Sequence, residues 1–306
     1  MLASLVAALI SAFCYGIAAV MQAMAVRSAS RRPARIRDGS PAAGRVDPGL
    51  IVRLLGQWRF VASLGIDIIG FLAQLVALRR LPLFAVQAVI ASNLAVTAVF
   101  AAWLMQVRLR LAEWLAVTGV IVGVGLLGTS AGAEGAADVD PPFQIALMVT
   151  VAVVALAGMA AARLHGPART PLLGACAGLG YAVLAVSARI LPGFSVTQLV
   201  HSPAAYTLAA AGIVSFMLYA TALEGGSVTV ATAAVVLVET VPPAIVGVVF
   251  LGDTTRHGLT GVAVSGFILA VASAVALARF GEAGEQTLAG VDGEAAPDRS
   301  RAITPV

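Results

Sequence analysis

The chain has 306 residues, of which 60% are hydrophobic and 11% are charged, and its formal net charge is +4. Soluble domains carry about 25% charged residues, so this composition excludes an ordinary water-soluble fold and favours one core of helices packed in lipid. All 19 basic residues are arginines, which excludes chemistry that depends on lysine. The arginines flank apolar segments, so they indicate orientation in a bilayer and not nucleic acid binding.

Nine stretches are long and apolar enough to span a membrane, which takes roughly 17–25 residues each. The bilayer core cannot satisfy bare backbone, so each stretch must be a helix. We therefore predict an all-α, polytopic membrane helix bundle of about nine transmembrane helices within residues 1–280. The predicted spans are Leu2–Val26, Phe60–Leu78, Leu83–Gln106, Trp114–Ser130, Phe143–Ala162, Leu172–Leu191, Ala204–Leu223, Val228–Leu251 and Leu259–Ala278.

Two polar regions do not have the pattern of a membrane helix. Residues 27–57 form an Arg/Pro-rich loop, and residues 281–306 form a polar tail that we expect to be disordered. A short interfacial helix is predicted at the end of the loop, because apolar residues recur there at helical spacing. These residues are Leu50, Ile51, Leu54, Leu55 and Trp58.

The distribution of arginine predicts the orientation. With the loop over residues 27–57 placed in the cytoplasm, 15 arginines lie on that side and 4 on the other. The positive-inside rule then places the N-terminus outside and the C-terminus in the cytoplasm. The sequence predicts a multi-pass protein of the inner membrane.

Two carboxylates lie near the centres of predicted spans, Asp67 in Phe60–Leu78 and Glu239 in Val228–Leu251. A charge at that depth costs roughly 2.5–3.5 kcal/mol on insertion scales, so such residues usually mark an ion, proton or substrate path. The alternative is a protonated carboxyl bonded to a neighbour. Two acids make the bundle interior net negative, which favours cations or protons over strongly anionic cargo. If a cation is carried, Asp67 and Glu239 are the candidate metal ligands, and no cofactor is expected.

Polar residues form stripes on several of the predicted helices, which helices bathed only in lipid would not need. Mid-span polar residues are typical of transporters that bind substrate at the membrane midplane. The alternative is that the uncharged members only bond across helices, at about 0.6 kcal/mol each. We predict that a central cavity is lined by Asp67, Glu239, Tyr15, Asn93 and Tyr181, with Gln22 and Gln74 orienting the cargo.

Glu239 is followed closely by Pro242 and Pro243. Prolines remove backbone donors and free carbonyls, so we predict a helix break that lines the cavity, with a simple kink as the alternative. Arg189 is the only arginine within a predicted span and lies near its outer end. We consider it as a gate or an anion clamp, the alternative being that its side chain extends to the outer interface.

Several short motifs have simpler explanations. Gly123–Gly128 fits a dinucleotide-binding pattern but lies in an apolar helix without a preceding strand. The pairs Gly119/Gly123 and Gly174/Gly178 predict close helix packing. Gly128–Gly132 fits a hydrolase motif and lacks the strand-to-helix turn that such a motif needs, so we do not expect an enzyme. A membrane hydrolase remains a minor alternative, because the predicted outer side carries Ser130, His201, His257 and Asp253.

A faint internal repeat is visible. Cys14–Val20 resembles Gly180–Val186, and Ala77-Leu78 before the third span resembles Ala222-Leu223 before the eighth. These matches pair helices 1–4 with helices 6–9. Five spans separate helix 1 from helix 6, so the two point in opposite directions, which predicts an inverted repeat.

The order of these features resembles the EamA-like drug/metabolite transporter superfamily. Gly65–Phe71, continuing to Val86-Gln87-Ala88, is similar to its second-to-third span unit, and Ala222–Val228 is similar to the second-repeat equivalent. Nine spans with the N-terminus outside are similar to the NIPA-type magnesium transporters, and the resemblance places Asp67 where that branch tends to carry a glutamate. The chain departs from the pattern in lacking a tenth span and in having Gln87 or a neighbour where the third span usually has a proline.

Together these features predict a secondary transporter of a small solute or cation that works by alternating access. Proton coupling and magnesium-like transport of a divalent cation both stay open. The alternative is a non-transporting membrane scaffold or partner of cell-envelope proteins. The expected partners are the lipid bilayer and a small-molecule or cation substrate, homodimerisation is left open, and nucleic acid is not expected.

Overall fold

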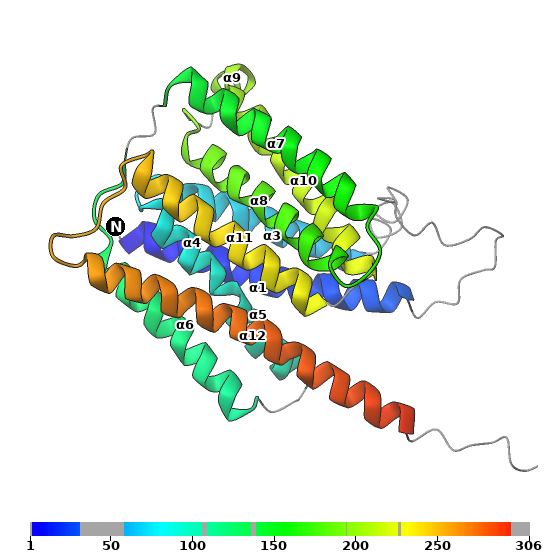
Figure 1. Cartoon of the computed structure of the whole chain (residues 1–306). Coiled ribbons are helices and arrows are strands. Elements are labelled where there is room, and N and C mark those ends of the chain that lie inside the picture. Colours follow the sequence, from blue (N-terminus) through cyan, green and yellow to red (C-terminus); the bar gives the residue numbers. More distant parts are fainter. Residues whose placement is uncertain are drawn as a thin grey trace, which may run out of the picture.

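The computed structural model describes residues 2–30, 58–105, 109–135, 139–193, 195–225 and 228–294. Over these residues the chain is helical and has no strand, apart from one isolated bridge between Ala131 and Thr255. The helices are α1 (Leu2–Ser30), α3 (Trp58–Leu78), α4 (Leu83–Ala91), α5 (Asn93–Met105), α6 (Leu111–Ser130), α7 (Pro141–Ala162), α8 (Arg169–Arg189), α9 (Val196–His201), α10 (Pro203–Gly225), α11 (Val228–Val249) and α12 (Thr260–Glu294) (Figure 1).

Nine helical segments of the described chain are long and apolar enough to cross a membrane, which confirms the predicted number of spans. The third of them, Leu83–Leu104, consists of α4 and α5 together. Large apolar side chains are exposed along the outer faces of these helices, for example Ile68, Ile69 and Leu72 on α3. Such faces are stable only against lipid or another apolar surface, so the chain is a multi-pass membrane protein.

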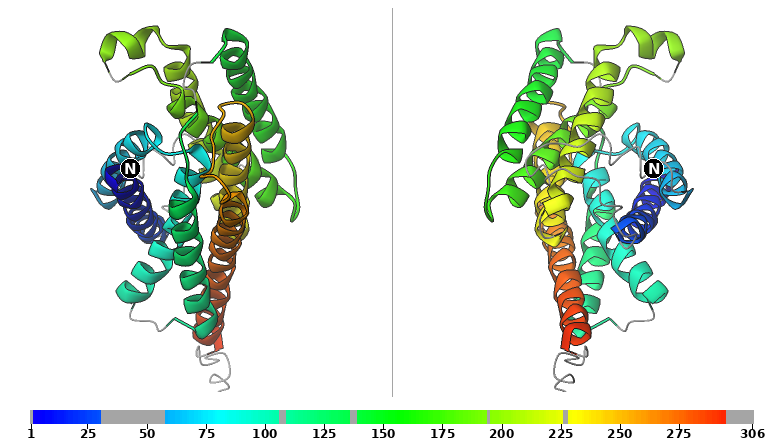
Figure 2. Two further views of the ribbon diagram at one scale, coloured as in Figure 1. Left: turned by 90° about the vertical axis from the view of Figure 1, so that its left-hand side faces the viewer. Right: turned by 90° about the vertical axis from the view of Figure 1, so that its right-hand side faces the viewer.

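The helices pack in pairs around a central element. α1 packs against α3, α8 against α10, and α6 against α12, while α11 contacts α8, α4 and α12 (Figure 2). α4 is buried along its whole length and also contacts α1, α3 and α6. It therefore lies at the centre of the bundle, where polar side chains from several helices can meet.

Glycines allow the closest helix crossings, as predicted. A Cβ built on Gly123 would lie 2.6 Å from the backbone nitrogen of Ala270 in α12. One built on Gly178 would lie 2.6 Å from the carbonyl oxygen of Val235 in α11. Side chains at these positions would push the helices apart, so the motif over Gly123–Gly128 serves packing of α6.

The predicted helix break at Pro242 and Pro243 is wrong. α11 continues through both prolines from Val228 to Val249. The break lies in the third span, where α4 ends at Ala91 and α5 begins at Asn93. At Ser92 between them, the backbone N–H and the hydroxyl both donate to the carbonyl of Val89, at 3.1 and 2.5 Å, which tightens the turn.

The described chain also differs from the prediction at its C-terminal side. α12 continues to Glu294, so residues 281–294 are helical and the expectation of disorder from residue 281 is wrong for them. Extending a helix that is already formed costs little, and this stretch contains helix-favouring Glu, Ala, Gln and Leu. Residues 295–306, most of the loop over residues 27–57 and the predicted interfacial helix before Trp58 lie outside the described residues.

Four connections meet at one end of the bundle, the end at which the N-terminus also lies (Figure 1). Arg189 and Asp253 make the side-chain bonds that join these connections or the helix ends beside them. The four connections are residues 79–82, 131–135, 190–193 and 250–259. We call this the Asp253 end. Predicted spans alternate in direction, so these four connections belong on one side of a membrane.

Candidate functional site

Four of the predicted site residues form two polar contacts between α1 and α3. The hydroxyl of Tyr15 donates to Gln74 Oε1 at 2.7 Å, and Gln22 Nε2 donates to Asp67 Oδ2 at 2.5 Å. Tyr15 and Gln22 lie seven residues apart on α1, and their partners Gln74 and Asp67 lie seven residues apart on α3 in the opposite direction. This is the spacing that an antiparallel pair of helices requires. Gly70 lies between these contacts, where a Cβ would be 2.9 Å from that of Cys14. The two predicted polar stripes therefore face each other.

Asp67 is half-buried, and one of its carboxylate oxygens accepts the bond from Gln22. This geometry matches the alternative in which the acid is bonded to a neighbouring helix. A single amide donor leaves most of the carboxylate's acceptor capacity unused.

A small polar pocket lies where the break between α4 and α5 faces α11. Its volume is about 10 Å³, which is about the space for one water molecule. Two predicted site residues, Asn93 and Glu239, line it, whereas Asp67, Tyr15 and Tyr181 do not. The lining consists of Gln87, Ile90, Ala91, Asn93, Val236, Glu239 and Thr240.

Gln87 is the residue that organises this pocket. Its Nε2 donates to the main-chain carbonyl of Glu239 at 3.0 Å. In an α-helix that carbonyl would accept from the N–H four residues later, but this position is Pro243, which has none. The Gln87 amide therefore supplies the donor that the proline removes, which explains how α11 stays continuous.

The bond from Nε2 to the Glu239 carbonyl also fixes the position of the Gln87 amide oxygen, Oε1. Gln87 is only 2% exposed, and its Oε1 is buried without a hydrogen-bond partner among the described residues. The Glu239 carboxyl and the Asn93 side chain are half-buried and make no hydrogen bond within the described part of the chain. Three polar groups thus line one water-sized space with acceptor capacity left unused.

Tyr181 lies in the same interior region without lining the pocket. It is within electrostatic range of Glu239, Asp67, Tyr15 and Tyr219. Tyr15 is likewise within range of both acids. Tyr219 of α10 shares a hydrogen bond of 3.0 Å with the hydroxyl of Thr232 on α11. Tyrosines from α1, α8 and α10 therefore lie within electrostatic range of Glu239.

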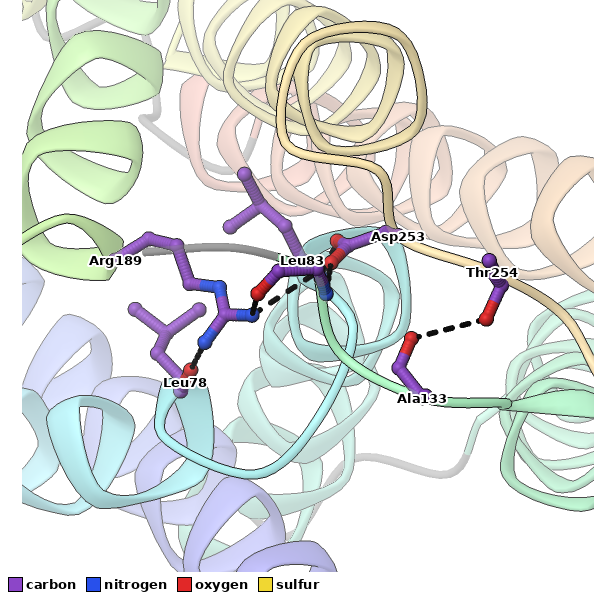
Figure 3. Close-up of polar contacts among 7 residues, drawn as sticks. Leu78, Leu83, Ala133, Arg189, Asp253 and Thr254 are labelled. Atoms are coloured by element: carbon purple, nitrogen blue, oxygen red, sulfur yellow. Dashed lines mark hydrogen bonds and ion pairs between the residues drawn. The ribbon is translucent and has the colours of Figure 1, made fainter. Parts of the chain in front are cut away.

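Arg189 and Asp253 form a buried ion pair at the Asp253 end (Figure 3), with Nη2 of Arg189 lying 3.7 Å from Oδ1 of Asp253. Arg189 is 3% exposed, so the predicted extension of its side chain to the outer interface is wrong. Its guanidinium also donates to the carbonyls of Leu78 and Gly135, the latter at 2.9 Å. The arginine thus joins α8 to the end of α3 and to the loop after α6.

Asp253 satisfies two further backbone donors. Its carboxylate accepts from the N–H of Leu83 at 2.5 Å and from the N–H of Gly135 at 2.8 Å. Leu83 begins α4, so Asp253 acts as a cap supplied from a distant segment, at the helix end that favours negative charge. Burial of both charges is tolerable because each is paired and hydrogen-bonded.

Backbone contacts extend this closure along the segment that follows. The N–H and hydroxyl of Thr254 donate to the carbonyl of Ala133, and Figure 3 shows the hydroxyl contact. The N–H of Gly132 donates to Thr254 and the N–H of Arg256 donates to Ser130, and all of these distances are 2.9–3.2 Å. The loop after α6 and the loop after α11 are therefore held together, and with the ion pair they close the Asp253 end.

The hydrolase alternative does not fit this geometry. Ser130 is fully buried, and its hydroxyl donates to the carbonyl of Leu127 in its own helix. Asp253 is bonded to Leu83, Gly135 and Arg189, and His201 contacts the carbonyl of Thr197. The described residues do not arrange Ser130, a histidine and Asp253 as a triad.

The described residues contain no group of three or more His, Cys, Asp or Glu side chains that could hold a metal ion. Asp67 and Glu239 have different surroundings, because Asp67 accepts a bond from Gln22 and Glu239 lines the pocket. A second cavity of about 170 Å³ lies near the Asp253 end between α1, α4 and α6, and Arg256 is its only polar lining side chain. Polar cargo groups would find no partners there besides Arg256.

Sequence reasoning missed the roles of Gln87 and Asp253. Gln87 departs from the family pattern, and a glutamine in an otherwise apolar span six residues before Asn93 is itself a signal. Asp253 was considered only as part of a hydrolase. An acid just beyond the eighth span could have been paired with Arg189, the only arginine within a predicted span.

Comparison of this chain with protein-family models, with curated proteins and with solved structures gives no match. A functional assignment consequently depends on the chain's own residues. The relevant geometry is the polar pocket beside the α4–α5 break and the buried ion pair that closes the Asp253 end.

Proposed function

We propose that this protein is a membrane transporter that moves a small solute or cation by alternating access. The observation that carries the proposal is the pocket at the α4–α5 break, inside a bundle of apolar helices. Glu239 and Asn93 line it beside Gln87 Oε1, which is buried without a hydrogen-bond partner among the described residues. Such groups are costly within a membrane unless water, an ion or cargo meets them there. Broken helices that line a cavity are typical of secondary transporters.

We also propose that the first four spans and the last four spans form an inverted repeat. The first four are α1, α3, α4 with α5, and α6, and the last four are α8, α10, α11 and α12. The pairing of helices supports this. Contact of α1 with α3 is matched by contact of α8 with α10, and contact of α1 with α4 and α5 is matched by contact of α8 with α11. The pairs α4–α11 and α6–α12 each join equivalent spans, third with eighth and fourth with ninth. A two-fold relation between the halves would produce this pattern.

In this proposal the Arg189–Asp253 pair is the gate at one end. Opening that end requires separating α8 from the segment after α11, which breaks the ion pair. The arginine distribution supports an orientation in which this end and the N-terminus lie outside and the C-terminus lies in the cytoplasm. We propose the inner membrane as the location. The membrane potential would supply about 2.3 kcal/mol per charge per 100 mV for a cation carried inward.

The resemblance to drug/metabolite transporters supports alternating access. It supports magnesium less, because no cluster of three acidic or other metal-binding side chains occurs among the described residues. We therefore propose a cation or small cationic solute as cargo and not a tightly ligated divalent ion.

The test is flux in proteoliposomes that contain the full chain, with Na⁺, Mg²⁺, methylammonium and ethidium as probes and with either a proton or a sodium gradient imposed. We expect at least one probe to move faster than in protein-free vesicles, and Glu239→Gln to reduce that flux at least tenfold. Asp140→Asn, an exposed acid at the start of α7, is the matched control and should transport normally. Absence of flux for every probe, with cellular function retained in Glu239→Gln, would instead support the membrane scaffold.

A further inference from the structure

The pocket beside the α4–α5 break has the chemistry of an ion site. Its polar lining side chains are those of Glu239, Gln87, Asn93 and Thr240, and all four carry an oxygen atom that can bind a cation. Gln87 cannot turn its amide to offer a donor, because its Nε2 is bonded to the Glu239 carbonyl at 3.0 Å. The space between these groups is about 10 Å³, about one water molecule.

We propose that this pocket binds one dehydrated monovalent alkali cation, held by the Glu239 carboxylate, Gln87 Oε1 and the Asn93 amide oxygen. Oxygen ligands of this kind suit hard cations. The cation would satisfy Gln87 Oε1, which is buried and lacks a partner among the described residues. The inference rests on the proposed function only in treating the ion as the one that drives transport.

Charge and size favour a monovalent over a divalent ion. One carboxylate lines the pocket, so a single positive charge leaves the site neutral within the membrane. Mg²⁺ sheds its water reluctantly and usually keeps several water ligands, and a space for about one water cannot hold them. Asp67 is not among the lining residues, and its carboxylate accepts a hydrogen bond from Gln22, so it adds no second charge to the pocket lining.

The position of the pocket links the ion to the fold. Gln87 and Asn93 lie on the two sides of the α4–α5 break, and Glu239 lies on α11. A bound cation would draw the two halves of the third span toward the eighth span. Equivalent spans of the two proposed repeats would then be coupled by the ion, which is the contact that must change when such repeats move against each other.

The closing experiment measures binding without transport. The full chain is purified in detergent, and its thermal unfolding is followed in NaCl, KCl, LiCl or choline chloride at equal ionic strength, with retention of radioactive Na⁺ and Rb⁺ giving the stoichiometry. We expect at least one alkali ion to raise the midpoint relative to choline, with about one ion retained per chain. Asn93→Ala, which leaves the Gln87–Glu239 bond in place, should weaken the apparent affinity about tenfold, and Glu239→Gln should abolish binding.

Asp140→Asn serves as the control with one acid removed from the surface, and gel filtration of each variant checks that it is folded. The inference is overturned if alkali ions act no differently from choline, which would mean that the pocket holds only water. Displacement of bound Na⁺ by an equal concentration of Mg²⁺, or unchanged binding in both variants, would overturn it as well. Ion binding without any flux would support the site and contradict the transporter, whereas flux without ion binding would do the reverse.

Discussion

The Gln87 side chain has two roles, since it satisfies a main-chain carbonyl of α11 and also lines the pocket. Its amide nitrogen satisfies the Glu239 carbonyl that Pro243 leaves without a donor, and its amide oxygen is thereby fixed toward the pocket. A buried carbonyl without a partner costs about 1–3 kcal/mol, so this contact is worth keeping even if the pocket were empty. The two roles can be separated by mutation, because only the first depends on the proline.

Gln87→Leu should lower the thermal unfolding midpoint, since it leaves the Glu239 carbonyl unsatisfied at a cost of about 1–3 kcal/mol. Adding Pro243→Ala returns a backbone N–H to the position that would bond this carbonyl. We expect the double variant to recover most of the lost stability while still lacking ion binding. A double variant no more stable than Gln87→Leu would contradict the proposed pairing.

At the scale of helices, the closest crossings depend on glycines. Glycine is needed at these positions because a neighbouring helix leaves no room for a side chain, and not because of the local backbone conformation. Gly123 of α6 faces the backbone of α12 near Ala270, whereas a Cβ on Gly125 of the same helix would meet nothing within 4 Å. Both glycines lie in α6 two residues apart, so they form a matched pair for testing how much helix packing depends on glycine.

Gly123→Ala should destabilise the protein, because its new methyl group would lie 2.6 Å from the Ala270 nitrogen and force α6 and α12 apart. Gly125→Ala should be neutral or stabilising by up to about 1 kcal/mol, because alanine favours a helix more than glycine does. Thermal unfolding in detergent measures both. Equal effects of the two substitutions would indicate that this crossing is not a determinant of stability.

At the scale of the whole molecule, closure of the Asp253 end joins segments that are far apart in the sequence. The ion pair and the backbone contacts hold the loop after α6 against the loop after α11, and both against the start of α4. Truncating one partner of a buried ion pair is costly, about 3–5 kcal/mol, so a covalent bridge is a cleaner probe of gating than removing Arg189.

Ala131→Cys with Thr255→Cys places two cysteines at the bridge position, where antiparallel partners have the spacing that a disulfide needs. With Cys14 and Cys176 changed to serine, oxidation should stop flux and reduction should restore it. Each single cysteine variant should be insensitive to oxidant. Full flux in the oxidised double variant would show that the loops after α6 and α11 do not need to separate during transport.

The predicted orientation has its own test. Thr254→Cys in the same cysteine-free background is exposed at the Asp253 end, and Arg279→Cys is exposed toward the other end of α12. A membrane-impermeant maleimide added to intact cells should label the first variant and not the second. The reverse labelling would mean that the arginine distribution does not set the topology.

The sequence alone determined the membrane spans, because their length and apolar content leave a helix as the only way to satisfy the backbone in lipid. It also determined the glycine crossings and the polar stripes of α1 and α3, since both follow from helical periodicity within one segment. The tertiary structure decided which distant residue meets which. Gln87 and Glu239 lie 152 positions apart, and nothing local to Pro243 indicates that its missing donor is replaced from α4. The break at Ser92 and the burial of Arg189 against Asp253 were decided in the same way, because the rotation of each helix is set by all of its neighbours together.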